Sequence, residues 1–234
     1  MNQSNRYGDL DPRMGEVVFK TKESQVAELL RERILAGFFK RGEKLRQAEI
    51  ANMFNLSITP VREALKLLEA EGYVLGASHR GAIVAPLALE QVEELFELRL
   101  ELEGRLAREA TKRITPDGIA ALESINDEMV EVLRHGDMAA HRQNNFRFHF
   151  RLYEMANLPQ TLHFVRIVWA KYPFELLAAM PNRPTVVNGE HEQILEALRS
   201  GDPKAAMKAV NAHIESGHSK FKKCYADEIK RGYV

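Results

Sequence analysis

The segment from Leu45 to Pro86 constrains the fold most strongly, because it reads as two short helices followed by a hairpin. Between the helices, Asn55 tolerates the left-handed backbone that ends a helix, and Ser57 is a favourable N-cap. Pro60 falls in the first turn of the second helix, where its missing N–H costs little. This order is typical of a winged helix-turn-helix, which places its second helix in the DNA major groove. An ordinary helical subdomain that happens to carry a hairpin is the alternative.

The second of these helices has two distinct faces. Val61, Leu65 and Leu68 recur at helical spacing, so this stripe should be buried. Another face carries the side chains that would meet a duplex, which are Ile58, Thr59, Arg62 and Lys66. After Gly72, a good helix stop, comes a hairpin with a basic tip, formed by His79, Arg80 and Gly81.

Composition bounds the class of protein. The chain has 234 residues, of which 45% are hydrophobic and 28% charged, as in a globular protein with a substantial core. No apolar run approaches the ~20 residues that span a bilayer, and the polar N-terminus does not read as a signal peptide, so we expect no membrane association. Cys224 is the only cysteine, which excludes an internal disulfide and suits a reducing cytoplasm.

Charge by itself gives little support to nucleic-acid binding. The formal net charge is zero, and residues 1–87 carry 13 Lys and Arg against 11 Asp and Glu. The DNA-binding hypothesis therefore depends on where the cations fall, including Arg46 on the preceding helix. A weakly charged domain of this kind would gain affinity from dimerisation.

The chain divides into three parts. Residues 1–19 are polar and read as a loose arm, residues 20–87 hold a first helix and the winged segment, and residues 88–234 read as helix throughout. The predicted fold is mainly α, with an N-terminal winged helix-turn-helix that has a small β-hairpin wing, and a C-terminal all-α six-helix bundle. The bundle helices are expected at about 90–114, 115–135, 137–156, 161–180, 185–199 and 203–229.

Three histidines and an asparagine form a candidate metal site on this bundle. Asn145 and His149 are four residues apart and leave one face of a helix, while His191 and His213 belong to the last two helices. An amide oxygen and three imidazoles would suit a divalent ion such as Zn²⁺ or Ni²⁺. Separate core or surface roles are the alternative, because spacing alone does not bring three helices together.

Residues 23–86 resemble the DNA-binding domain of GntR-type transcription regulators. The phrases ILAG, GEKL, EIA, SITPVREAL and LEAEG follow the order and spacing of that family. The resemblance implies that Arg62 approaches the duplex from the recognition helix, with Ser57 and Thr59 near phosphates and Arg46 on the backbone. The wing residues that would reach the minor groove or backbone are His79, Arg80 and Gly81.

Position 58 departs from that family, which usually has arginine there. Arginine would read guanine through a bidentate contact worth ~1–3 kcal/mol of discrimination, whereas Ile58 offers only apolar contact, for instance to a thymine methyl. We therefore expect an operator that differs from the common one at that base pair.

Residues 90–220 resemble the ligand-binding FCD domain of the FadR subgroup of GntR regulators. The matching phrases are ELR, NFRFH, EHEQILEAL, GD and the stretch that ends at His213. In metal-binding members an acidic residue four positions before the first histidine joins three histidines around one ion, which implies that His149, His191 and His213 are ligands here. Asn145 stands at the acidic position, so the site has less negative charge.

The same resemblance implies an effector site. Arg99 matches an arginine that faces the bundle cavity and meets the effector's carboxylate, which a guanidinium binds in a bidentate manner. An exposed ion pair with Glu103 is the alternative role for Arg99. Arg147 is a further effector-binding candidate. Other side chains that could border the cavity are Arg151, Tyr153, Trp169, Tyr172 and Phe174.

These features together predict a homodimeric, cytoplasmic transcription repressor that binds a palindromic operator and is released by a small carboxylate metabolite. The alternatives are a metal-dependent hydrolase or isomerase built on the three-histidine site, and a helical scaffold protein. Both would leave the winged segment without a role. The sequence also lacks a nucleophile-bearing turn and a phosphate-binding glycine loop, so we expect a regulator rather than an enzyme.

Overall fold

The turn between the two short helices forms as its residue types predict. The computed structural model describes residues 21–78, 81–87, 89–178, 180 and 182–230. In it, Asn55 has a φ of 53° and ends α2 (Gln47–Phe54), and the extended Ser57 begins α3 (Ile58–Ala70). α1 (Lys22–Leu35) packs against α3. The predicted helix-turn-helix is therefore confirmed, while the predicted arm at residues 1–19 lies outside the described residues.

Three short strands complete the winged half. β2 (Val74–Ser78) and β3 (Gly81–Val84) form the expected hairpin, and β1 (Lys44–Leu45) pairs with β3 to give an antiparallel sheet of order β1-β3-β2. The sequence does not predict β1, because two residues are too few to show alternation. Gly81 has a φ of 118°, and a Cβ there would lie 2.0 Å from the Leu45 carbonyl oxygen, so only glycine lets β1 approach.

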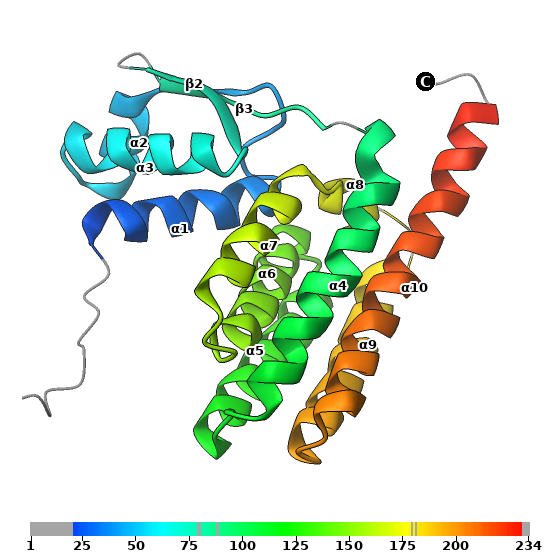
Figure 1. Cartoon of the computed structure of the whole chain (residues 1–234). Helices are drawn as coiled ribbons and strands as arrows, with labels where there is room; N and C mark the ends of the chain where they lie inside the picture. The colour runs from blue at the N-terminus through cyan, green and yellow to red at the C-terminus, as the bar shows by residue number, and fades with distance from the viewer. Residues whose placement is uncertain (1–20, 79–80, 88, 179, 181, 231–234) are drawn as a thin grey trace, which may run out of the picture.

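The second half is helical and stands below the winged half in Figure 1. After a 3₁₀ turn at Leu89–Gln91, its helices are α4 (Val92–Thr111), α5 (Pro116–Arg134), α6 (Met138–Glu154), α7 (Pro159–Lys171), α8 (Phe174–Ala178), α9 (Arg183–Arg199) and α10 (Pro203–Lys230). None of the described helices is both long and apolar enough to cross a membrane.

One predicted bundle helix is in fact two. The expected helix over 161–180 is divided into α7 and α8, so the described part of the bundle has seven helices rather than six. Pro173 explains the break, because proline disfavours α-helical backbone in the residue before it, and Tyr172 is extended with ψ of 140°. The division places the short α8 beside the winged half.

Direct contacts join the two halves. Arg142 Nε on α6 donates to the Ala36 carbonyl at the end of α1 at 2.6 Å, and Arg41 Nε donates to Glu175 on α8 at 2.7 Å. Buried apolar side chains from both halves belong to one continuous cluster. The end of α1 and the segment that holds Arg41 are therefore in direct contact with α6 and α8.

Candidate functional site

The recognition helix α3 presents its predicted polar face to solvent. Val61, Leu65 and Leu68 are fully buried, whereas Arg62 and Lys66 are exposed. Ile58 is 45% exposed at the start of the helix. Because nearly half of this side chain is open to solvent, it is available for an apolar contact with another molecule.

The cations on and near this face, Arg46, Arg62 and Lys66, differ in their partners. Arg46 forms a 2.9 Å ion pair with Glu49, and Lys66 forms a 3.0 Å pair with Glu63. All four side chains are exposed, and such pairs contribute little to stability, so a phosphate can replace either carboxylate. Arg62 has no hydrogen bond or ion pair with any residue that the structure describes. Of the cations on the recognition helix, Arg62 is therefore the one without an ion-pair partner among the described residues.

The wing is described only in part. His79 and Arg80 lie outside the described residues, and Gly81 is buried against β1, which explains a glycine there without a DNA contact. Ser57 and Thr59 are exposed at the N-terminus of α3, and the Ser57 side chain makes no capping hydrogen bond. The first N–H groups of a helix lack intrahelical partners and attract anions, so this end of α3 suits a phosphate.

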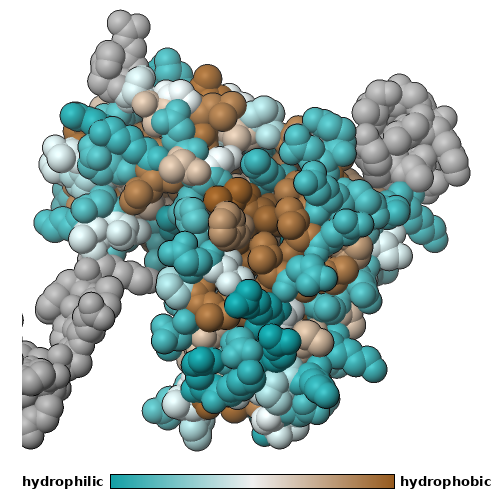
Figure 2. Space-filling view, in the orientation of Figure 1, coloured by the Kyte–Doolittle hydropathy of each residue, from teal (hydrophilic) through white to brown (hydrophobic). Residues whose placement is uncertain are grey.

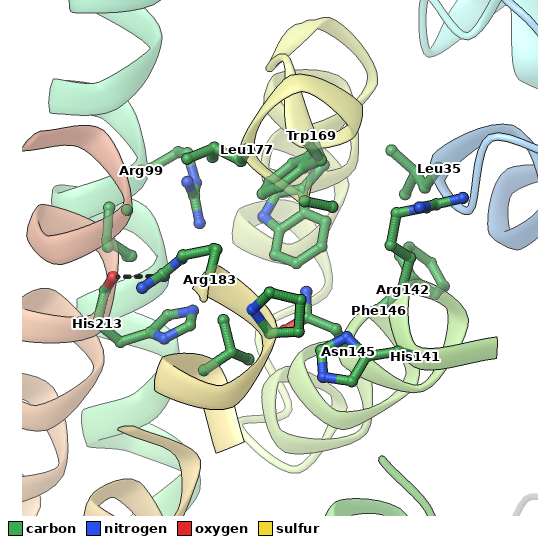
Figure 3. Close-up of a pocket in the computed structure, with 16 residues that line it drawn as sticks. Leu35, Arg99, His141, Arg142, Asn145, Phe146, Trp169, Leu177, Arg183 and His213 are labelled. Atoms are coloured by element: carbon green, nitrogen blue, oxygen red, sulfur yellow. Dashed lines mark hydrogen bonds between the residues drawn. The ribbon is translucent and has the colours of Figure 1, made fainter. Parts of the chain in front are cut away.

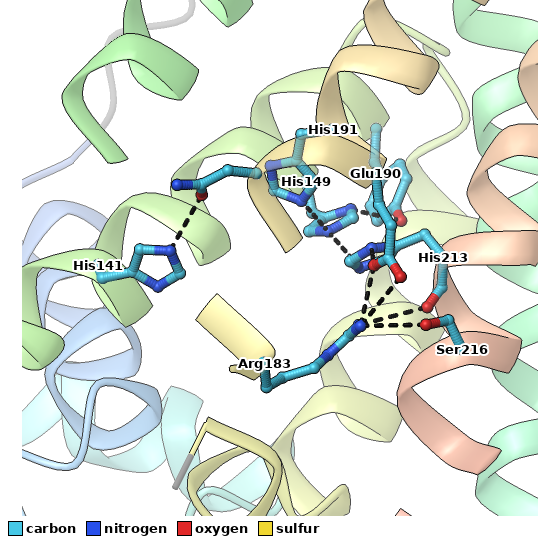
Figure 4. Close-up of polar contacts among 9 residues, drawn as sticks. His141, His149, Arg183, Glu190, His191, His213 and Ser216 are labelled. Carbon is cyan, nitrogen blue, oxygen red and sulfur yellow. Dashed lines mark hydrogen bonds and ion pairs between the residues drawn. The ribbon is translucent and has the colours of Figure 1, made fainter. Parts of the chain in front are cut away.

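Three histidines from different helices meet in the core of the bundle (Figure 4). His149 on α6, His191 on α9 and His213 on α10 are all buried. The Nε2 atom of His149 lies 3.2 Å from Nε2 of His191 and 3.2 Å from Nε2 of His213. Candidate ligand atoms of the three rings all lie within 4.8 Å of one another, so the fold brings together the three histidines that the sequence singles out.

Neighbouring hydrogen bonds assign the proton on two of these rings. Tyr153 donates its hydroxyl proton to Glu103 Oε2 at 2.6 Å, so its oxygen accepts from His149 Nδ1 at 3.1 Å. His213 Nδ1 donates to Glu190 Oε2 at 2.8 Å. Both neutral rings then turn an Nε2 lone pair toward each other. Two facing lone pairs repel, and a divalent cation bound between them would relieve this repulsion.

Burial keeps these imidazoles neutral. It lowers the pKa of His149 and His191 well below the usual histidine value, and the neighbouring rings lower both further. Burial also lowers the pKa of His213, although the Glu190 carboxylate opposes the shift. Because neutral imidazole is the form that binds metals, ligation here requires no loss of a proton near neutral pH.

Asn145 is the residue predicted as a fourth ligand. Its Oδ1 is buried and has no hydrogen-bond partner among the described residues. The side chain lines the same cavity as His213 (Figure 3). A buried amide oxygen without a partner costs free energy unless another group binds it. An oxygen and three imidazole nitrogens together fit a divalent transition metal ion.

Arg99 is buried and forms the ion pair considered from the sequence. Its Nε donates to Glu103 Oε1 at 2.6 Å, and only 3% of its side chain is exposed. The guanidinium carbon lies 4.5 Å from the ring centre of Tyr172 and 4.8 Å from that of Phe174. Burial opposes the charged form, but the charge and hydrogen bond of Glu103 together with Tyr172 and Tyr153 outweigh it and raise the pKa of Arg99. Arg99 also lines the cavity, so its positive charge lies beside the space that a ligand would occupy.

The cavity holds about 630 Å³ when its opening to solvent is included. Leu35 of α1 contributes to its wall, so the winged half borders it (Figure 3). Of the aromatic side chains expected at the cavity, Trp169 and Phe174 line it. The lining also includes three cationic or titratable side chains that the sequence analysis does not single out, His141, Arg142 and Arg183.

A sequence signal exists for only one of these three. His141, Asn145 and His149 recur at intervals of four along α6, which places them on one face of that helix. Arg183 stands beside Pro184 in a segment that reads as a linker, and nothing in its spacing marks it.

Arg183 contacts groups that adjoin the histidine cluster (Figure 4). Its Nη1 lies 3.0 Å from Glu190 and 3.2 Å from Ser216 Oγ, and its Nη2 donates to the His213 carbonyl at 3.4 Å. Burial by itself would raise the pKa of Glu190, but His213 and Arg183 lower it. Glu190 is therefore a carboxylate that holds the His213 ring in position.

Arg147 lies elsewhere on α6. It forms a 2.9 Å ion pair with Glu128 on α5 and donates to Asn144 Oδ1 at 2.8 Å, with 41% of its side chain exposed. It is not among the residues that line the cavity with Arg99, and neither is the exposed Arg151. These two arginines face away from the histidine cluster because they occupy other faces of the same helix.

Both halves of the chain match known families. Residues 22–84 match the bacterial regulatory proteins of the gntR family, and residues 94–216 match the FCD domain. The HTH-type transcriptional regulator McbR of Escherichia coli is 25% identical over 197 residues, which are 82% of this chain and 88% of that protein. A probable D-xylose utilization operon transcriptional repressor of Paenarthrobacter nicotinovorans is 29% identical over 195 residues, 83% of this chain and 86% of that protein.

A solved structure shares the fold. The structure of E. coli McbR/YncC superposes with a TM-score of 0.73 at 23% identity, and the match covers 88% of this chain and 100% of that one. The arrangement of a winged domain on a helical bundle is therefore common to both proteins.

Proposed function

Because this chain belongs to the GntR family of transcription regulators and carries an FCD domain, we propose that it is a repressor that a small carboxylate metabolite releases from its operator. The relatives that match both halves are transcription regulators rather than enzymes, which removes the reason to assign catalysis to the histidine cluster. The observation that carries the proposal is a cavity that borders the DNA-binding half and is lined by cationic side chains and candidate metal ligands.

Four side chains would hold a divalent ion, Zn²⁺ or Ni²⁺, at the edge of this cavity. They are Asn145, His149, His191 and His213. Such an ion supplies positive charge and an open coordination position to an oxygen of the ligand. The neutral Asn145 removes one negative charge from the ligand set. This weakens the hold on the ion but leaves the site more attractive to an anion.

The effector carboxylate would bind Arg99. Only Nε of this guanidinium donates to Glu103, and Arg99 lines the cavity. Figure 3 places Arg99 and His213 on the same side of the cavity, so one carboxylate could contact both the arginine and the ion. Bidentate contact with a buried guanidinium provides affinity and orientation together.

An apolar face supports a homodimer. Leu98 on α4 is 40% exposed and Phe164 on α7 is 55% exposed. Figure 2 shows a brown patch in this region, and the groove beside these residues is also lined by Leu95, Leu102, Ile167 and Val168. Contiguous exposed apolar surface marks interaction sites. A two-fold dimer formed through this face would present two α3 helices to the half-sites of a palindromic operator in the cytoplasm.

Selection of sheared genomic DNA on the purified protein tests this proposal. The bound DNA is eluted in salt steps and sequenced, with and without added Zn²⁺ or Ni²⁺. We expect a short palindrome that survives moderate salt. Organic acids suggested by the neighbouring genes are then tested for release of that DNA. Failure to enrich any sequence under all of these conditions contradicts DNA recognition, and an operator complex that no acid weakens contradicts the effector assignment.

Substitution of Ile58, the residue that departs from the usual family arginine, tests the operator prediction. Ile58→Arg should move the base preference toward guanine at one position in each half-site, with ~1–3 kcal/mol of discrimination. A repeated selection with this variant measures the change. An unchanged preference would show that residue 58 does not read a base.

A further inference from the structure

Arg142 lies between the cavity and the DNA-binding half. It lines the cavity beside His141 and Asn145. Its Nε also donates to the carbonyl of Ala36, the C-cap of α1, at 2.6 Å. Arg142 therefore borders the effector cavity, and its guanidinium contacts the first helix of the DNA-binding half.

Arg142 differs from the other two arginines of the cavity in its charge balance. Arg99 has Glu103 at 2.6 Å, and Arg183 has Glu190 at 3.0 Å. No carboxylate in the described part of the chain lies within ion-pair distance of Arg142. Glu175 attracts it from farther away, but that carboxylate is bound by Arg41 at 2.7 Å. A half-buried guanidinium without a close anion is a favourable site for an anionic ligand group.

The surroundings of Arg142 are also suited to an acidic group. His141 Nε2 lies 3.1 Å from Asn188 Oδ1, and burial lowers the pKa of this histidine, so it is a neutral hydrogen-bonding neighbour. Figure 3 shows Arg142 and Leu35 on the opposite side of the cavity from Arg99 and His213. Arg99 and Arg142 thus border the cavity from two opposite sides.

We infer that the effector is a dicarboxylate whose second carboxylate binds Arg142, an inference that rests on the proposed binding of the first carboxylate by Arg99 and the ion. The first carboxylate occupies the end with His213, and the second pairs with the guanidinium that holds the Ala36 carbonyl. Because Arg142 then shares its donors between the ligand and α1, occupation of the cavity changes the contact that positions the winged half.

The only tryptophan of the chain gives a direct readout, because Trp169 lines this cavity. Zn²⁺-loaded full-length protein is titrated with malonate, succinate, glutarate and adipate, and with the monocarboxylates of equal carbon number, propionate, butyrate, valerate and hexanoate. Tryptophan fluorescence reports binding. We expect at least one dicarboxylate to bind about tenfold more tightly than its matched monocarboxylate, because a hydrogen-bonded charge contributes that much affinity.

Two neighbouring substitutions separate the role of Arg142 in ligand binding from its role between the halves. Arg142→Gln should remove the preference for the dicarboxylate and leave monocarboxylate affinity unchanged. Gln143→Ala is the matched control, because Gln143 Nε2 also reaches α1, at 2.8 Å from Glu32 Oε2, but does not line the cavity. This variant should keep the preference of the wild type.

The outcomes distinguish this inference from the proposed function. Monocarboxylates that bind as tightly as dicarboxylates, or an Arg142→Gln variant that keeps the preference, overturn the second subsite and leave the carboxylate effector intact. Loss of affinity for both acid classes in Arg142→Gln also overturns it, because the residue would then act on the whole cavity. If the loaded wild type binds none of the eight acids, both this subsite and the proposed carboxylate effector fail.

Discussion

Each half of the molecule contains a buried arginine–glutamate pair, and the two pairs are used differently. In the winged half, Arg31 on α1 binds Glu71 at the end of α3 through two parallel hydrogen bonds, Nε to Oε2 and Nη2 to Oε1, the latter at 2.9 Å. In the bundle, Arg99 gives Glu103 only its Nε. The first pair is bidentate, whereas the second uses one guanidinium N–H group and borders a cavity.

The two pairs also differ in what the second carboxylate oxygen of the glutamate binds. Glu103 Oε2 accepts the Tyr153 hydroxyl proton, and Tyr153 in turn contacts His149. A continuous chain of hydrogen bonds therefore runs from Arg99 to a candidate metal ligand. Glu71 has no such continuation among the described residues. The two pairs are therefore similar in burial and chemistry but differ in role. The pair in the winged half stabilises the structure, whereas the pair in the bundle positions hydrogen-bonding groups around a candidate site.

The largest expected effect follows from removing the carboxylate of each pair, which compares the two pairs directly. Glu71→Gln and Glu103→Gln should each lower the free energy of unfolding of the metal-free protein by ~3–5 kcal/mol, because each leaves a buried guanidinium without its anion. Urea denaturation measures this loss. Only Glu103→Gln should also weaken Zn²⁺ binding, by about 10–100-fold, because it disturbs the partner of His149. Calorimetry that finds equal weakening in Glu71→Gln would remove the distinction between the pairs.

Metal addition tests whether the bundle pair belongs to a metal site. With Zn²⁺ at about 100 times its Kd, the wild type should gain ~2.7 kcal/mol of stability, and His149→Ala should gain almost none. His135→Ala is the control, because His135 lies on α5 of the same bundle with its side chain 74% exposed. Thermal unfolding with and without Zn²⁺ measures the gain. Equal stabilisation of His149→Ala and wild type would exclude this cluster as the site.

The exposed face of the winged half should respond in DNA affinity instead of stability. Arg62→Ala should weaken operator binding by ~1–3 kcal/mol, because it removes a cation that has no partner among the described residues. Arg134→Ala, which changes an exposed arginine at the far end of α5, should leave the affinity unchanged. Fluorescence anisotropy with the selected operator measures both. Equal losses in the two variants would indicate a nonspecific effect of charge.

The smallest effect concerns pH and the cavity wall. Burial lowers the pKa of His141 in the folded chain below its value in the unfolded chain, so the unfolded chain takes up a proton first as the pH falls. The stability from neutral His141 is therefore present above about pH 6.5 and is lost as the pH falls below it, with a slope of at most ~1.4 kcal/mol per pH unit. His141→Gln should flatten this acid dependence in the metal-free protein. Urea denaturation at several pH values measures it, and parallel curves would contradict it.

The winged half follows from the sequence because its signals are local. Asn55, Ser57 and Gly72 mark the ends of its helices, and the spacing of Val61, Leu65 and Leu68 identifies the buried face of α3. β1 escapes prediction because it is too short to show a period and depends on a partner strand.

The bundle site follows from the sequence only in part. The resemblance to FCD domains marks the three histidines, and the structure brings them together. Spacing does not reveal Arg183, which approaches Glu190 and Ser216 only when α9 and α10 pack. It also does not show that Arg147 pairs with Glu128 on a neighbouring helix instead of lining the cavity.

The sequence by itself determined the family and the helix-turn-helix, because residue type and spacing along one chain segment decide both, and the family resemblance marked the three histidines. Only the tertiary structure decided which cations face the cavity and that Arg142 bridges it to α1. The physical reason is that the direction of a side chain and its burial depend on helices that are distant in sequence. A periodic pattern defines a face of a helix, but packing decides what that face meets.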